Sequence, residues 1–116
     1  MSLASFKQYH QQRTVRVLQQ REQLRTAWLH RAQEVIGLLA PQFPAIQQVA
    51  LFGSIAKPGR FHHQSDIDVA VICLDAEQES RFWRALEEAL QWDVDLRPLS
   101  GPISQAVQQY GAVVYG

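Results

Sequence analysis

Two aspartates, Asp66 and Asp68, stand one residue apart at the start of the apolar run IDVAVICL. In an extended strand, residues i and i+2 point to the same face, so the two carboxylates project together with Cα atoms roughly 7 Å apart. Two carboxylates in a partly buried site raise each other's pKa, and a divalent cation removes that cost. Mg²⁺ is usually held by one or two carboxylates together with substrate phosphates and water. The pair therefore predicts a magnesium ion bound with a phosphate.

A third carboxylate comes from residues 92–96, WDVDL, which repeat the alternation of acidic and apolar side chains. If this segment is a strand beside the one that carries Asp66 and Asp68, then Asp95, or alternatively Asp93, joins the acidic pair. Three acids can hold two metal ions, one on the attacking oxygen and one on the phosphates. The pattern indicates metal-assisted phosphoryl chemistry.

Gly53 and Ser54 follow the apolar segment QVALF, residues 48–52, and precede a polar loop over residues 57–65. At the start of a short helical turn, free backbone N–H groups and a hydroxyl can bind phosphate oxygens. Glycine suits this position because the phosphate must approach the backbone closely. The turn is therefore a candidate phosphate site, although a Gly-Ser pair alone has little specificity.

These groups have to be positioned by a small set of helices and strands. The apolar spacing predicts helices over residues 3–40 and 77–90 and a last helix from Ser100 or Ser104 to about Tyr110. Strands are expected at residues 48–52, 67–74 and 92–96, with a short one in the terminal AVVYG. In the helix at 77–90 the expected inward side chains are Phe82, Ala85, Leu86 and Ala89. The fold class is α/β (α+β), a small mixed sheet flanked by helices.

The first helix is long for a chain of 116 residues. Ser5 and Gln8 form a possible capping box, and an unbroken helix of roughly 36 residues would extend about 54 Å. The rest of the chain cannot cover that length. Either the helix bends near residues 19–23, QQREQ, where no apolar residue occurs, or its first half protrudes.

Charge, cysteine count and hydropathy limit which kinds of protein this chain can be. The chain has zero net charge, but residues 1–31 carry six basic residues against one acid, and the rest carries the compensating negative charge. The basic segment either meets an acidic surface or is a solvated helix face. Cys73 is the single cysteine, which excludes a disulfide framework and fits a reducing cytoplasm. No apolar stretch is long enough to span a membrane, so a cytoplasmic protein without membrane or direct nucleic-acid binding is expected.

The ordered set of motifs resembles a known family. Residues 51–96 are similar to the minimal nucleotidyltransferase (MNT) domains of the DNA polymerase β superfamily, whose signature is Gly-Ser, a loop, Asp-x-Asp and a later single Asp. The loop here, residues 55–65, is one residue longer than usual, a change that a surface loop tolerates. The resemblance covers roughly residues 25–116 and implies a polymerase β-like fold, with residues 1–24 as an N-terminal helical extension.

The resemblance also implies roles for individual residues. Gly53 and Ser54 would bind the triphosphate of ATP, and Lys57 and Arg60 in the loop would balance its charge. The metal ligands for Mg²⁺ would be three catalytic acids: Asp66, Asp68 and Asp95. Of these, Asp95 would also take the proton of the attacking hydroxyl. His62 and His63 are adjacent in the loop and are expected on the surface.

Members of this family pair with HEPN-domain ribonuclease toxins and act as antitoxins, which implies transfer of AMP from ATP to a tyrosine of such a toxin. Two alternatives stay open: an antitoxin that neutralises by binding alone, and a nucleotidyltransferase for a small molecule or an RNA end. Few residues follow Asp95, so we expect the acceptor to be a separate protein. The basic first helix, with Leu3, Phe6 and Tyr9 on its first turns, is a candidate surface for that partner or for a homo-oligomer.

Overall fold

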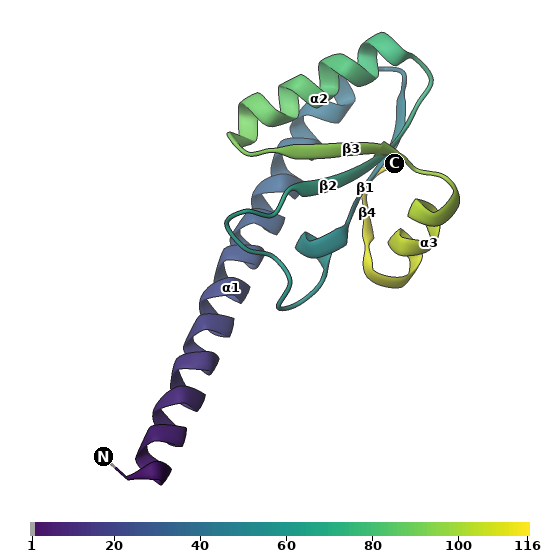
Figure 1. Cartoon of the computed structure of the whole chain (residues 1–116). Coiled ribbons are helices and arrows are strands. Elements are labelled where there is room, and N and C mark those ends of the chain that lie inside the picture. The colour runs from purple at the N-terminus through teal and green to yellow at the C-terminus, as the bar shows by residue number, and fades with distance from the viewer. Residues whose placement is uncertain (1) are drawn as a thin grey trace.

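Three α-helices pack around a four-stranded mixed sheet in the computed structural model, which describes residues 2–116 (Figure 1). The expected order of helices and strands is confirmed. Along the chain the elements are α1 Leu3–Leu39, β1 Ile46–Phe52, β2 Ile67–Cys73, α2 Ala76–Leu90, β3 Val94–Pro98, α3 Gly101–Tyr110 and β4 Ala112–Tyr115. Two 3₁₀ turns are η1 Ala40–Gln42 and η2 Gly53–Ala56.

The strands lie in the order β3-β2-β1-β4. β1 is antiparallel to both β2 and β4, whereas β2 and β3 run parallel and are joined through α2. Parallel neighbours need such a crossover, because a hairpin can join only antiparallel strands. The consequence for the site is that the acid-bearing strands β2 and β3 begin at the same edge of the sheet.

The main core lies between one face of the sheet and the helices α1 and α2. Its helical side chains come from both helices: Ala32, Val35, Ile36, Phe82, Leu86 and Leu90. The opposite face carries only a small cluster, in which Val107 of α3 packs on Ala50 and Ala70. Because side chains alternate along a strand, the residues between the core positions of β2 and β3 point to this thinly covered face.

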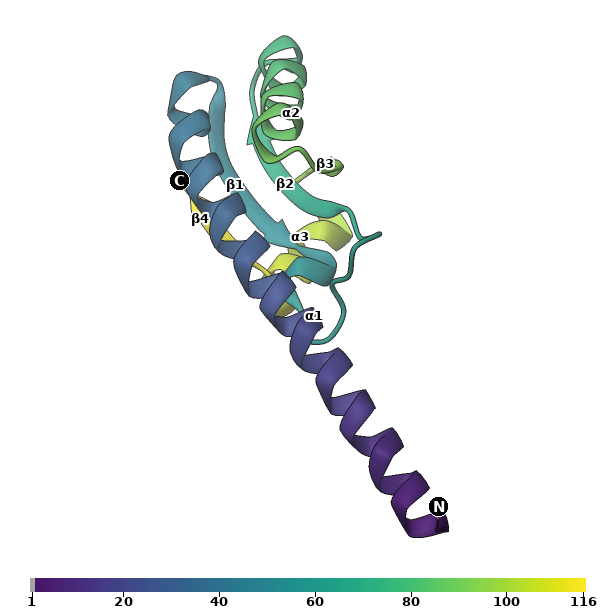
Figure 2. The ribbon, with the colours of Figure 1, turned by 90° about the vertical axis from the view of Figure 1, so that its left-hand side faces the viewer.

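α1 is one unbroken helix, and its first half projects from the rest of the molecule (Figure 2). Every residue from 2 to 21 is exposed, and buried side chains begin only at Ala32. Of the two alternatives for this helix, protrusion is therefore correct and the bend at residues 19–23 is wrong. The capping prediction was also wrong: Ser2, not Ser5, caps the helix and accepts a hydrogen bond from the Ser5 backbone N–H.

Two other local predictions need correction. β3 begins at Val94 and not at Trp92, because the indole of Trp92 packs at a tilt on Trp28, stacks on Phe61 and donates to the carbonyl of Ser65 at 2.7 Å. In α2, Ala89 is exposed and Leu90 is buried in its place. Within residues 2–116, none of the helices is long and apolar enough to cross a membrane.

Candidate active site

The Gly53-Ser54 turn follows β1 directly and forms the start of η2. Gly53 has φ +71°, in the left-handed region that glycine adopts without steric cost. A Cβ at this position would clash with the carboxylate of Asp68. Glycine therefore serves two purposes here, since it permits the backbone turn and lets the Asp68 carboxyl lie directly against it.

Asp68 and Asp95 are the second residues of β2 and β3, and the parallel register pairs them directly. Paired residues of neighbouring strands lie about 5 Å apart, so both side chains point side by side to the face opposite α1 and α2. Their apolar neighbours, such as Ile67 and Val94, are buried in the core. The register makes Asp95, and not Asp93, the direct neighbour of Asp68.

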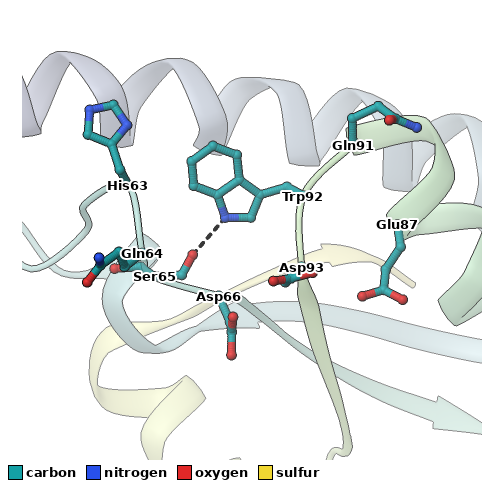
Figure 3. Close-up of a pocket in the computed structure, with 8 residues that line it drawn as sticks. All are labelled: His63, Gln64, Ser65, Asp66, Glu87, Gln91, Trp92 and Asp93. Carbon is teal, nitrogen blue, oxygen red and sulfur yellow. Dashed lines mark hydrogen bonds between the residues drawn. The ribbon is translucent and has the colours of Figure 1, made fainter.

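Asp66 and Asp93 lie just before β2 and β3, and both are exposed. They line a polar hollow of about 490 Å³ at the edge where these strands begin, together with His63, Gln64, Ser65, Glu87, Gln91 and Trp92. In Figure 3 the Asp66 carboxylate points away from α1, whereas the ring of Trp92 points toward it. Asp66 therefore borders both this hollow and the acidic pair, and neither Asp68 nor Asp95 lines the hollow.

The surroundings of Asp68 change the pKa of its carboxyl group. Burial, followed by the negative charges of Asp95 and Asp66, raises the pKa of Asp68 to about 6. The Arg97 charge and the Ser54 backbone N–H act in the opposite direction but do not cancel this rise. The charges of all three predicted acids therefore act on one another at this site, and they oppose ionisation of Asp68.

Arg97 also lies at the site, although it was not predicted from the sequence. Its Nε lies 3.3 Å from Oδ1 of Asp95, so a positive charge stands beside the acidic pair. The signal was present in the sequence, because Arg97 is two residues beyond Asp95 and thus on the same face of the strand.

The donor set of the site fits a hard divalent cation. All three acids offer only carboxylate oxygens, which are the ligands that Mg²⁺ prefers. Among residues 2–116, however, no three acidic, histidine or cysteine side chains are grouped closely enough to hold a metal ion between them. The Asp68–Asp95 pair therefore suits a cation that obtains the rest of its ligands from a bound molecule.

The two basic residues of the loop lie in different surroundings. Lys57 is directed toward α3, where its Nζ lies 4.6 Å from the ring centroid of Tyr110. Arg60 is exposed, as are His62 and His63.

One apolar side chain anchors the polar loop that follows the Gly-Ser turn. Phe61 is fully buried and stacks on Trp92, with ring centroids 5.8 Å apart. Trp92 in turn holds the Ser65 carbonyl, next to Asp66. The segment between the Gly-Ser turn and the acidic pair is thus anchored to the core, although most of its residues are polar.

Comparison with known proteins agrees with this geometry. The model of the polymerase beta nucleotidyltransferase family matches residues 33–116. A curated relative, the protein adenylyltransferase MntA of Shewanella oneidensis, is 36% identical over 89 residues, which cover 72% of this chain. The match spans 63% of that relative's length.

Two solved structures are similar in fold and sequence. A crystal structure of a toxin-antitoxin with AMP-PNP matches with a TM-score of 0.60 and 33% identity, over 72% of this chain and 73% of that chain. A structure of the tri-AMPylated Shewanella oneidensis HEPN toxin in complex with MNT antitoxin matches with a TM-score of 0.54 and 30% identity. This second match covers 76% of this chain and 71% of that chain.

Proposed function

The chain belongs to the polymerase beta nucleotidyltransferase family, and from that membership we propose that it transfers AMP from ATP to a hydroxyl of a partner HEPN toxin. We propose a tyrosine as the acceptor and neutralisation of the toxin as the result. The relatives support this assignment, since one is named a protein adenylyltransferase and others were solved with AMP-PNP or with an AMPylated HEPN toxin. A cytoplasmic location, where ATP is available, is part of the proposal.

The observation that carries the proposal is the pairing of Asp68 with Asp95 beside Gly53. Two carboxylates from different strands, one of them directly against a glycine turn, place an acidic site next to a candidate phosphate-binding one. A binding surface that acted by contact alone would not need this arrangement, because burying Asp68 between two other acids disfavours its ionised form.

In the proposed reaction the Gly53-Ser54 turn receives the triphosphate of ATP, and Lys57 and Arg60 balance its charge. Asp68 and Asp95 would hold Mg²⁺ together with phosphate oxygens, and the third predicted ligand, Asp66, would add its negative charge beside them. When bound, this cation polarises the phosphates and neutralises their charge. The acceptor oxygen forms a bond to the α-phosphorus as the bond to pyrophosphate breaks. The hydroxyl proton passes to Asp95, whose Oδ1 is held by Arg97.

The test is to incubate the protein with its HEPN partner, ATP and Mg²⁺ and to measure the mass of the partner. Wild-type protein should add AMP, and Asp68→Asn and Asp95→Asn should abolish the addition while the variants stay folded. Asp93→Asn is the matched control: it removes an exposed acid two residues from Asp95 and should retain transfer.

Each other outcome has a defined meaning. Transfer by the Asp68→Asn, Asp95→Asn double variant would refute the assignment of the site. Inhibition of the partner by wild-type protein without any added mass would favour the antitoxin that acts by binding alone. Labelling of a small molecule or an RNA end, with no labelling of the partner, would favour the third alternative.

A further inference from the structure

A pair of charged residues on α1 contacts the loop that follows the Gly-Ser turn. Arg25 donates from Nε and Nη2 to the carboxylate of Glu22, with Nη2 and Oε2 3.0 Å apart. Its remaining terminal nitrogen, Nη1, donates to the backbone carbonyl of Ile55 in η2 at 3.1 Å. The Arg25 side chain is only 15% exposed, so these bonds are largely shielded from water.

Glu22 makes a contact of its own with the same loop. The backbone N–H of Gly59 donates to Oε1 of Glu22 at 2.6 Å. The loop is thus held at Ile55 by Arg25 and at Gly59 by Glu22, on either side of Lys57. The hydrogen bonds from Arg25 and from Gly59 lower the pKa of Glu22, so this carboxylate stays ionised and keeps its acceptor capacity.

Helix stability does not account for these contacts. A second pair with the same i, i+3 spacing, Arg31 and Glu34, lies on the same helix but is 52% and 72% exposed, with its charged atoms 3.7 Å apart. Such exposed pairs stabilise a helix only slightly. The Glu22–Arg25 pair differs because it satisfies a backbone carbonyl and a backbone N–H that belong to the loop.

The hydrogen bond from Arg25 reaches the residue next to the Gly53-Ser54 turn. Ile55 follows Ser54 directly, and its side chain is fully buried while its carbonyl bonds to Arg25. The Ser54 carbonyl accepts from the Lys57 N–H, which closes the turn. The peptide groups on both sides of Ile55 are therefore hydrogen-bonded, directly after the Gly53-Ser54 turn.

We propose that Glu22 and Arg25 are positioning residues that hold the Gly53-Ser54 turn and the following loop in the orientation that receives the triphosphate. The proposal rests on the proposed function, because it needs the turn to be the triphosphate site. Neither residue touches the nucleotide. Both act through the backbone at Ile55 and Gly59.

The test measures the Kd of AMP-PNP with Mg²⁺ by titration calorimetry, and the hydrogen exchange of the loop amides of residues 55–57, 59 and 60. Arg25→Ala should weaken binding roughly tenfold or more, the effect of losing a charge-assisted hydrogen bond, and should speed exchange at Gly59. Arg25→Lys should not restore binding, because one ammonium group cannot reproduce the guanidinium fork. Glu22→Gln keeps an acceptor for Gly59 and should be intermediate.

Arg31→Ala and Glu34→Gln are the matched controls and should leave both measurements unchanged. If wild-type protein binds AMP-PNP and folded Arg25→Ala binds it equally well, the inference is overturned while the proposed function stands. If wild-type protein does not bind AMP-PNP, the proposed function fails and the inference fails with it. Faster exchange over the whole chain, rather than in the loop, would point to general destabilisation and would also count against the inference.

Discussion

Burial and two neighbouring carboxylates raise the pKa of Asp68 to about 6, whereas an unfolded aspartate titrates near pH 3.9. Between these values the folded state binds more protons than the unfolded state, so this residue contributes less stability as the pH rises. The contribution is fully lost above about pH 6. Ionised Asp68 is therefore unfavourable for folding at neutral pH, where the proposed chemistry needs it.

We predict that Asp68→Asn stabilises the protein at pH 8 by about 1–2 kcal/mol, a value discounted because the side chain is only half-buried. At pH 4 the gain should nearly vanish, because wild-type Asp68 is then largely protonated in the folded state. Urea unfolding of both proteins at the two pH values measures this difference. Asp93→Asn controls for loss of an exposed charge, and an equal gain at pH 4 and pH 8 would contradict the prediction.

Gly53 and Gly59 offer a second comparison between single residues. Both have positive φ, +71° at Gly53 and +77° at Gly59. A Cβ added at Gly53 would clash with Asp68, whereas a Cβ added at Gly59 would have no atom within 4 Å. Alanine at either position carries the same backbone strain of about 1–2 kcal/mol. We predict that Gly53→Ala also displaces Asp68 and abolishes AMP transfer, whereas Gly59→Ala retains it. Equal loss in the two variants would attribute the effect to backbone strain alone.

The candidate acids could be found from the sequence because strand alternation is a local property. The i, i+2 spacing identifies Asp66 with Asp68 and Asp93 with Asp95 as candidate pairs. It leaves the choice between Asp93 and Asp95 open, and only the register of β2 and β3 shows that Asp95 is the neighbour of Asp68. The Glu22–Arg25 contacts could not be found in this way. They join residues 30 and 37 positions apart in the chain, and no local pattern encodes such a pairing.

At the scale of elements, the sequence predicted which segments form helices and strands better than where they begin. β3 starts two residues late because the Trp92 side chain packs on Trp28 and Phe61, a tertiary contact that overrides strand propensity. Phe61 was not predicted as a core residue, because it lies in a polar loop and its burial depends on a tertiary contact with Trp92. In α2, Phe82 and Leu86 are buried as predicted, Ala85 is only partly buried, and Leu90 is buried in place of Ala89.

The N-termini of α2 and α3 provide a prediction about stability. The Asp75 side chain caps α2 by accepting from the Gln78 N–H at 2.9 Å, whereas Ser100 precedes α3 without any side-chain cap bond. Asp75→Ala should lower the free energy of unfolding by about 1 kcal/mol, and Ser100→Ala should change it by much less. Chemical denaturation of the two variants tests this. A loss for Asp75→Ala no larger than that for Ser100→Ala would contradict the prediction.

The whole molecule is elongated, with principal extents of 64 × 28 × 18 Å, because the first half of α1 lies outside the packed domain. That half carries the apolar residues Leu3, Phe6 and Tyr9, each more than half exposed. Residues 2–21 also contain four basic residues and no acid. An exposed helix with apolar and basic side chains is a suitable surface for the proposed HEPN partner.

We predict that deleting residues 2–20 separates partner binding from folding and from nucleotide binding. The free energy of unfolding should change by less than about 0.5 kcal/mol, because the deletion removes only exposed side chains. AMP-PNP binding should be retained, since Glu22 and Arg25 remain. Affinity for the HEPN partner, measured by calorimetry, should fall at least tenfold, and serine at Leu3, Phe6 and Tyr9 should reproduce most of that loss. Unchanged partner affinity, with dissociation of a homo-oligomer in sedimentation, would assign this half of α1 to self-association instead.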